Sequence, residues 1–556
     1  MKDKSIRMFT KPFSKEGFVL VYLGAIIVVG LLAYANSFTV PFQFDDARVI
    51  LFAKDFFDKP WVLLLKFPLR SLVNYSFAIE YHYFKDSVFA YHLSNLAIHL
   101  VNSILVGYLF YSLVKSLLAT TNNSLFKYAK YYSLFIALLF VSHPIQTQAV
   151  TYIIQRYASL ATTWYLLGFL VYINTRKQWN LWWKERKKQL VISWGLILAF
   201  FCLGVLTKST IFSLPATLIF SELVIYKKKF DVKFAFLTVL SPLLGLLFIY
   251  QTYQSLWFFS PKVSNQNEVI TQASYLLTQT KVLPKYFQLL AVPVGQNIDH
   301  HIPVSQAVGM SELFGTIAIF ALVFFSWKYR RKYPLLIFGI GWIFITLSIE
   351  SSIIVLEDVI YEHRLYLPSF GFFVVVIWLI DRVITKRRDF VTSVSLLVLM
   401  VFVYTGLTIQ RNQIWQTPLS LWADATRKSP AKSRPHLNYA VELQKKGLLD
   451  QASAEYKTTL LLDPKKYKAL GNLASIYVIE KKYDLAKQLY SKSLEIEPDY
   501  LDAYVGLGVI EINSGDLQTA GSYFAKAKSI DSKSELVIKN LQLLDELLER
   551  PKYIPN

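Results

Sequence analysis

The chain contains apolar runs that are long enough to cross a lipid bilayer. Phe18–Tyr34, Val191–Leu206 and Phe390–Thr408 are nearly continuous examples, and about 20 apolar residues in a helix cover the hydrocarbon layer of a membrane. Of the 556 residues, 54% are hydrophobic and only 17% are charged, whereas a soluble globular chain has about 25% charged residues. The sequence therefore predicts an all-α, polytopic membrane protein.

The basic residues indicate how these runs cross the membrane. Lysine and arginine are concentrated in every second short loop between apolar runs, which is typical of cytoplasmic loops. The first run is expected to be a retained helix, because no small-residue cleavage site follows it. We therefore expect a cytoplasmic N-terminus, about eleven spans and, since that number is odd, a C-terminal region on the outer side. The expected spans are residues 18–36, 88–114, 131–142, 151–173, 190–206, 210–226, 234–254, 311–327, 334–350, 369–381 and 390–409.

The formal net charge of +21 raises the question of nucleic-acid binding. The lysines and arginines do not form one stripe with interleaved aromatic residues, as they do on nucleic-acid-binding surfaces, so no nucleic-acid partner is expected. The single cysteine, Cys202, lies in an apolar run. A disulfide framework and a thiolate metal site are therefore excluded.

The first outer loop contains an amphipathic segment, Pro60–Phe84. Its aromatic and apolar residues recur at helical spacing and are mixed with Lys66, Arg70 and Glu80. This pattern predicts one or two helices that lie in the membrane interface, in contact with lipid. A pair of buried loop helices is the alternative.

From Arg411 onward the composition changes to mixed charge and a repeat begins. Pro464 and Pro498 are 34 residues apart, which is the period of the tetratricopeptide repeat. The same register is kept by small and aromatic residues, namely Ala452, Ala486, Ala520, Tyr456, Tyr490 and Phe524. We expect a membrane domain over residues 1–410 and a soluble α-solenoid over 411–556, with repeats near 433–466, 467–500 and 501–534 and a capping helix at 535–549. Such arrays bind peptides or proteins; a purely structural role is the alternative.

Asp45 and Asp46 are adjacent carboxylates about ten residues after the first expected span. On the outer side, in front of the amphipathic segment, they form a candidate base or metal-ligand site at the lipid–water boundary. The alternative is a turn or a helix cap, because aspartate readily accepts hydrogen bonds from nearby backbone amides.

Other ionisable residues are predicted on the same side of the membrane. Charged groups at membrane depth are costly and usually face a partner or a cavity, although each could also reach the interface alone. A shared polar site explains their common placement more simply than separate roles do. These residues are His143, Arg156, Lys208, Glu362, His363 and Arg364.

Their chemistry suits glycosyl transfer from a lipid-linked phosphate. Guanidinium and ammonium groups bind phosphate, and a carboxylate can take the proton of an attacking hydroxyl. Transfer from a polyprenyl phosphate sugar needs both functions.

Four motifs, in this order, carry a resemblance to a known family. They are Phe44-Asp45-Asp46, Tyr91-His92-Leu93-Ser94-Asn95 followed by His99, His143-Pro144-Ile145-Gln146-Thr147-Gln148-Ala149-Val150, and Glu362-His363-Arg364-Leu365-Tyr366-Leu367-Pro368-Ser369-Phe370-Gly371. With its C-terminal repeats, nearly the whole chain resembles the transmembrane and tetratricopeptide repeat containing proteins and their bacterial relatives. That family is similar to the protein O-mannosyltransferases of the GT-C membrane fold.

The resemblance implies roles for particular residues. Asp45 or Asp46 would be the catalytic acid of the first outer loop, while Arg364, Arg156 and Lys208 would handle the donor phosphate. Supporting roles in the active site would fall to Arg70, His92, His143, Glu362 and His363.

The chain departs from the family at two places that bear on metal binding. Gln146-Thr147-Gln148 stands where many relatives have an acid, and Lys208-Ser209 replaces a Lys-Glu pair. Both changes favour a base mechanism without a metal, although a divalent ion stays possible as a cofactor. Asp299-His300-His301 contains competent metal ligands, but three contiguous side chains rarely converge on one ion, so a loop role is favoured.

The leading hypothesis is a membrane glycosyltransferase. It would transfer mannose or another hexose from a polyprenyl phosphate to a protein Ser/Thr hydroxyl outside the cytoplasm, with the repeats binding the acceptor. About three repeats favour a bacterial relative, and hence the bacterial inner membrane. The rival hypotheses are a non-catalytic membrane scaffold that recruits partners through its repeats, and a transporter of a lipid-linked sugar.

Overall fold

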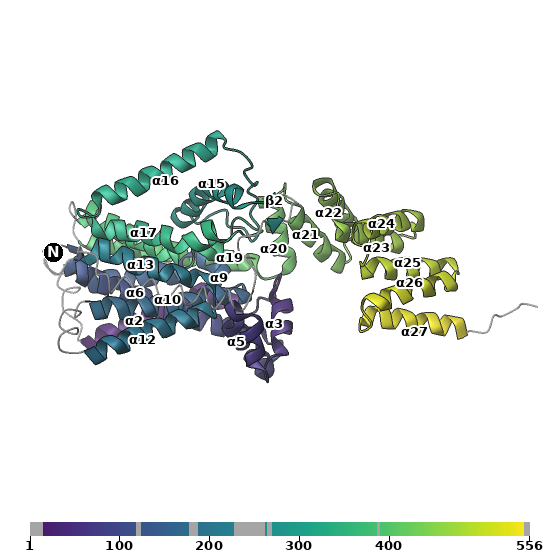
Figure 1. Ribbon diagram of the computed structural model, residues 1–556, viewed down its shortest axis with the longest axis horizontal. Helices are drawn as coiled ribbons and strands as arrows, with labels where there is room; N and C mark the ends of the chain where they lie inside the picture. The colour runs from purple at the N-terminus through teal and green to yellow at the C-terminus, as the bar shows by residue number, and fades with distance from the viewer. Residues whose placement is uncertain are drawn as a thin grey trace, which may run out of the picture. The chain divides into compact units, whose positions relative to one another are not determined.

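The computed structural model describes residues 15–117, 124–176, 187–226, 262–263, 269–385 and 390–549. The chain divides into two compact units, Met1–Thr417 and Pro418–Asn556 (Figure 1). Apart from one short antiparallel pair, β1 (Lys262–Val263) with β2 (Val269–Ile270), the regular structure of the described residues is helical. The predicted all-helical architecture of a membrane domain followed by repeats is confirmed.

The first unit has the long apolar helices of a multi-pass membrane protein. Among the described residues, seven helices are long and apolar enough to span a membrane, or nine if two bent pairs each count as one span. The seven are α2 (Lys15–Tyr34), α6 (Val88–Leu117), α12 (Lys187–Val205), the segment Ser209–Tyr226 around α13 (Leu214–Ser221), α16 (Met310–Tyr329), α17 (Pro334–Ser348) with its continuation to Ile353, and α19 (Phe390–Ile414).

The expected count of about eleven spans is not reached within the described residues. The expected span 234–254 lies outside them, as do residues 1–14 before the first expected span. Two further expected spans are helices, α10 (Arg156–Arg176) and α18 (Pro368–Ile380), but neither is among the candidate spans. The reason for α18 is its length of 13 residues, since a span needs about 20.

Helices α6, α8 (Ala129–Ser142), α10, α17 and α18 form the buried centre of the first unit. Where α17 meets α18, the backbones approach closely: a Cβ at Gly339 would lie 2.7 Å from the carbonyl oxygen of Gly371. Small residues permit such close helix packing in membranes. Buried polar groups are paired across helices, as where His99 Nδ1 lies 2.8 Å from the Tyr366 hydroxyl.

The segment that we expect to form the first outer loop folds into short helices. These are α3 (Asp46–Lys54), α4 (Pro60–Lys66), the 3-10 turn η2 (Pro68–Arg70) and α5 (Ser71–Phe84). Helices α3 and α5 pack together (Figure 1), while α4 turns sharply away from the segment that follows, at 119°. Trp61 and Leu65 on α4 are more than half exposed, as the interfacial interpretation expects; its placement against lipid stays a prediction.

Two irregular segments complete the part of the first unit that carries the candidate site. Helix α17 runs into a π-helical turn, η8 (Ile349–Ile353), and a 3-10 turn, η9 (Glu362–Leu365), precedes α18. Single π-turns inside helices occur frequently at functional sites. Helix α15 (Gln272–Ala291) and the loop after it pack against these turns through a cluster of buried apolar residues.

The second unit is a stack of helix pairs. After α20 (Pro418–Lys428), the pairs are α21 (Ser433–Lys445) with α22 (Leu449–Leu462), α23 (Tyr467–Ile479) with α24 (Tyr483–Ile496), and α25 (Leu501–Ser514) with α26 (Leu517–Ile530), followed by α27 (Glu535–Glu549). The predicted small positions Ala452, Ala486 and Ala520 are each 0% exposed. The predicted aromatic positions are likewise buried, which accounts for the 34-residue period seen in the sequence.

Candidate active site

Asp46 is a buried anchor of the first outer loop. Its Oδ2 accepts the backbone N–H of Gln43 at 2.9 Å, and its Oδ1 accepts that of Ile154 at 2.9 Å. Burial is the main reason that the pKa of Asp46 is raised from 3.8 to about 7; the hydrogen bonds oppose the shift and the charge of Asp45 adds to it. The carboxylate thus ties the loop to the segment before α10.

Asp45 has a different environment from its neighbour. It stands at the N-cap position of α3, but its side chain makes no capping hydrogen bond. Its side chain is 33% exposed and lies 3.0 Å from Arg48 in a surface ion pair, and such pairs add little stability. The geometry separates two roles that the sequence left open: Asp45 is accessible to a substrate, and Asp46 holds the loop.

Phe44 shows that the backbone is constrained at this point. Its φ is 49°, a left-handed conformation that is uncommon for a bulky residue. Such conformations cost about 1–3 kcal/mol and persist where surrounding contacts enforce them, often at functional sites. Here the two hydrogen bonds between Gln43 and Asp46, which bracket Phe44, supply that enforcement.

A second group of charges gathers around one carboxylate. Lys208 Nζ lies 3.1 Å from Glu350 Oε1 and 3.3 Å from Oε2, and Arg364 Nε lies 3.9 Å from Oε2. Arg364 is 2% exposed and its terminal nitrogens donate to the backbone carbonyls of Val359 and Asp358. Arg364 is therefore fixed in one orientation, with its Nε edge turned toward Glu350.

Arg70 and His363 belong to the same group. The backbone N–H of Leu72 donates to the carbonyl of Leu206 at 3.1 Å, which brings η2 to the end of α12, near Lys208. Burial lowers the pKa of His363 well below its usual value, and the charges of Lys208, Arg364 and Arg70 lower it further. The imidazole is therefore neutral. We call the three cations Arg70, Lys208 and Arg364, together with the neutral His363 beside them, the cation group.

Two members of the cation group have hydrogen-bonding capacity left over. His363 Nδ1 is buried and has no hydrogen-bond partner among the described residues. Arg70 is exposed, and its guanidinium stands 5.2 Å over the Tyr157 ring. A buried unpaired nitrogen is costly, so its position beside three cations indicates a site for an anionic ligand.

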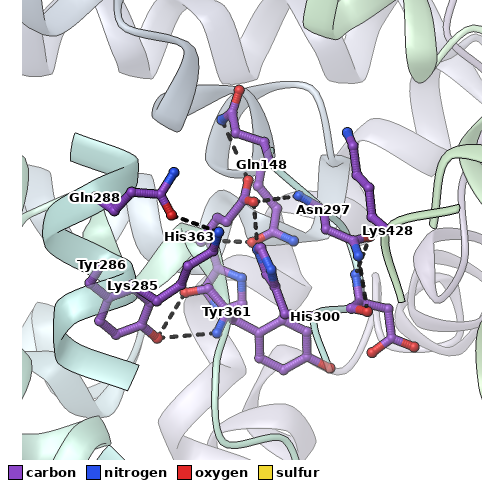
Figure 2. Close-up of polar contacts among 12 residues, drawn as sticks. Gln148, Lys285, Tyr286, Gln288, Asn297, His300, Tyr361, His363 and Lys428 are labelled. Carbon is purple, nitrogen blue, oxygen red and sulfur yellow. Dashed lines mark hydrogen bonds and ion pairs between the residues drawn. The ribbon is translucent and has the colours of Figure 1, made fainter. Parts of the chain in front are cut away.

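Glu362, next to His363, organises the loop after α15. Figure 2 shows His300, Asn297 and Gln148 around the η9 turn. Glu362 Oε1 accepts from the Asn297 backbone at 2.6 Å and from His300 Nε2 at 2.8 Å. Burial alone would raise the pKa of Glu362, but His300, Arg411 and the Asn297 amide bring it below its usual value. Glu362 is thus a structural carboxylate that is ionised at neutral pH.

Gln148 stands where the family resemblance leads us to expect an acid, and it has a clear structural partner. Its Oε1 accepts the backbone N–H of His363 at 2.7 Å. Gln146 donates from Nε2 to the Ser369 hydroxyl at 2.9 Å. Gln148 therefore holds the η9 turn in place (Figure 2), and Gln146 holds the start of α18.

The structure does not bring Arg156, His92 and His143 into the cation group. Arg156 lies 2.9 Å from Glu80 Oε2 and also donates to the Asn95 and Ser76 side chains. His143 Nδ1 accepts the Ile145 N–H as a helix cap, and one nitrogen of His92 lies 2.9 Å from the Val40 carbonyl oxygen. These side chains shape the surroundings of the site through helix contacts.

Two tyrosines lie beside these groups, one at the Asp45 loop and one at Arg364. Burial raises the pKa of Tyr152 well above its usual value, and the charges of Asp46, Asp45 and Tyr361 contribute. Tyr152 also accepts the Asp45 N–H at 3.3 Å, while the Arg364 guanidinium stands 5.4 Å from the Tyr361 ring centroid. Tyr152 thus lies at the Asp45 loop and Tyr361 beside Arg364, and the charge of Tyr361 acts on Tyr152.

Sequence reasoning missed several residues of this region, above all Glu350. A glutamate at the end of an apolar run is itself a signal, because ionisable groups at membrane depth are usually functional or paired. His300 has the chemistry of a metal ligand, but its Nε2 is hydrogen-bonded to Glu362. In the described residues, no group of three or more His, Cys, Asp or Glu side chains could hold a metal ion.

Comparisons with known proteins agree with both parts of the chain. Residues 467–500 and 501–534 match the family described as tetratricopeptide repeat. The chain is 22% identical to a protein O-mannosyl-transferase of Caenorhabditis elegans, in an alignment that covers 79% of this chain. It is 23% identical to human protein O-mannosyl-transferase TMTC3, in an alignment that covers 92% of this chain. It spans 62% of each of these relatives.

Shorter matches give higher identity. Human protein O-mannosyl-transferase TMTC1 is 29% identical over 21% of this chain and 14% of its own length. Among solved structures, the crystal structure of MamA aligns with 28% of this chain and 87% of its own, at 16% identity and a TM-score of 0.20. The long matches and the repeats together show that the chain carries tetratricopeptide repeats and is similar, over most of its length, to the TMTC protein O-mannosyl-transferases.

Proposed function

We propose that the chain is a membrane glycosyltransferase that transfers mannose or another hexose from a polyprenyl phosphate to a protein Ser/Thr hydroxyl on the extracytoplasmic side. The observation that carries this proposal is the meeting of Lys208 and Arg364 at one buried place, with the unpaired Nδ1 of His363 close by in sequence and an accessible carboxylate at Asp45. The names of the relatives support it.

The reaction needs one base and one anion site. Asp45 takes the proton of the acceptor hydroxyl as its oxygen attacks the sugar carbon C1. The bond between C1 and the phosphate oxygen breaks, and the leaving phosphate keeps the electron pair and gains a negative charge. Arg70, Lys208 and Arg364 stabilise this charge, and His363, with its proton on Nδ1, donates a hydrogen bond to the same phosphate.

The remaining predicted residues position this machinery. Asp46 fixes the Asp45 loop, Glu362 fixes the loop around His300, and Arg156 secures the helices behind the site. The repeats bind the acceptor protein, as stacked helix pairs commonly do. We place the protein in a bacterial inner membrane, with its N-terminus in the cytoplasm and its repeats outside. This topology would let these parts work together.

The test compares carboxylate variants of the first outer loop. Purified protein is incubated with a panel of polyprenyl phosphate sugars and an acceptor peptide, and free polyprenyl phosphate is measured. We expect Asp45→Asn to lower turnover by at least about a hundredfold and Asp46→Asn to lower it less. Asp55→Asn, an exposed site at the end of α3, is the matched control and should keep full turnover.

Two outcomes would oppose the proposal. Full turnover in Asp45→Asn would remove the proposed base. No turnover of any donor by the unaltered protein would favour the membrane scaffold, in which the helices only anchor the repeats.

A further inference from the structure

Glu350 is the carboxylate that faces the cation group, and the mechanism above gives it no role. It is 4% exposed and lies in the π-helical turn η8 at the end of α17. Among the ion pairs of the described residues, those of Lys208 and Arg364 are both made with Glu350. An anionic ligand that binds these cations therefore meets a negative charge already in place.

The Nε of Arg364 faces this carboxylate without a hydrogen bond to it. The Arg364 Nε lies 3.9 Å from Glu350 Oε2, which is beyond hydrogen-bond length, whereas its other nitrogens are engaged with backbone carbonyls. The backbone of Glu350 is held by Tyr275, whose hydroxyl donates to the Glu350 carbonyl at 2.5 Å. Glu350 thus has a fixed place next to a donor group that a phosphate oxygen can use.

The charges at the site match the change in charge during the reaction. The cations Arg70, Lys208 and Arg364 outnumber the single carboxylate of Glu350. A polyprenyl phosphate sugar is a phosphodiester with one negative charge, and the polyprenyl phosphate that leaves can carry two. An excess of positive charge stabilises the product-like transition state, but cations without any counter-charge would also retain the product.

We propose that Glu350 is the resident counter-ion of the cation group and that it sets how tightly the leaving polyprenyl phosphate is held. It is a positioning and specificity-determining residue, acting through Lys208 and Arg364. This inference rests on the proposed function and adds a residue that limits product retention. Without Glu350, the group would favour the doubly charged product over the singly charged donor.

The test measures binding of polyprenyl phosphate to full-length protein in nanodiscs, together with KM and kcat for the sugar donor. Glu350→Gln removes the charge but keeps the shape and an oxygen that can accept from Lys208. We expect the dissociation constant of polyprenyl phosphate to fall at least about tenfold and kcat to fall through product retention. The KM of the donor, which carries less charge, changes by a smaller factor.

A matched control separates this effect from the general loss of a buried carboxylate. Glu312, on α16, lies 3.1 Å from Lys281 in a comparable ion pair with 7% of its side chain exposed. Glu312→Gln should leave the affinity for polyprenyl phosphate unchanged. If both variants tighten binding equally, the proposed role of Glu350 is overturned.

A second pair of variants covers the case in which Glu350→Gln does not fold. Removing both partners of a buried ion pair is better tolerated than removing one, so Lys208→Gln is compared with the double variant that also carries Glu350→Gln. The added change should tighten polyprenyl phosphate binding relative to Lys208→Gln alone, and equal or weaker binding would overturn the inference. If the unaltered protein neither binds polyprenyl phosphate nor releases it from any donor, the proposed function itself fails, which is a distinct result.

Discussion

Asp46 shows how one residue can couple folding to pH. In the folded chain its pKa is about 7, against a usual value of 3.8. Between these values the folded state binds more protons than the unfolded state, so the free energy of unfolding falls as the pH rises from about 4 to about 7. Above that range the contribution of Asp46 is constant, because the carboxyl is ionised in both states.

We therefore expect the unaltered protein to lose thermal stability between pH 5 and pH 8 by more than Asp46→Asn does. The amide of the variant does not titrate. The contribution of Asp46 to the change in the free energy of unfolding with pH, at most about 1.4 kcal/mol per pH unit, is therefore lost in the variant. The measurement is the melting temperature in detergent at both pH values, read by tryptophan fluorescence. Parallel curves for the two proteins would show that Asp46 does not titrate in this range.

Residues that act locally were predictable from sequence, and residues that act across the fold were not. The pair Asp45-Asp46 was visible as a motif, yet only the contacts with Gln43 and Ile154 separate the anchor from the accessible group. Glu350 and Lys208 are 142 positions apart along the chain. No local pattern states which cations a lone glutamate will meet, because the helix packing decides it.

At the scale of elements, the repeats follow closely from their sequence. Their helices pack on immediate neighbours, so the small and aromatic positions carry most of the information. The first unit differs because its helices pack against partners far away in sequence. Two expected spans are helices that are not long or apolar enough to be candidate spans. One of them, α18, has the same length of 13 residues as the span expected at 369–381.

Gly508 and Gly521 provide a paired test of helix packing within the repeats. A Cβ at Gly508 would lie 2.4 Å from the buried ring of Phe524, whereas at Gly521 the nearest atom is a methyl group of Leu544 at 3.4 Å. We expect Gly508→Ala to destabilise the repeats by about 1–3 kcal/mol through overpacking. Gly521→Ala should be neutral or stabilising by up to about 1 kcal/mol, because alanine is the better helix former.

Thermal unfolding of the two variants, followed by circular dichroism at 222 nm, checks this difference. Equal melting temperatures would mean that the Phe524 ring moves aside without cost. A loss in Gly521→Ala as large as in Gly508→Ala would show that the interface of α26 with α27 is tighter than its contacts indicate.

At the scale of the whole molecule, the boundary between Thr417 and Pro418 separates two units with their own buried cores. Each pair of repeat helices buries its apolar residues against its neighbours in the same unit, through Tyr456, Tyr490 and Phe524 in turn. The residues proposed for the donor phosphate all belong to the first unit. Donor chemistry and acceptor binding should therefore be separable.

A chain that ends after Thr417 should still bind polyprenyl phosphate with an affinity within about threefold of the full-length protein. The reason is that Arg70, Lys208 and Arg364 keep their surroundings. A threefold change in affinity corresponds to less than about 1 kcal/mol of binding free energy. The shortened chain's transfer of sugar to a folded protein acceptor should fall much further. Residues 418–556 expressed alone should be helical and unfold cooperatively. Loss of polyprenyl phosphate binding in the shortened chain, despite correct folding, would mean that the repeats form part of the donor site and do not serve the acceptor alone.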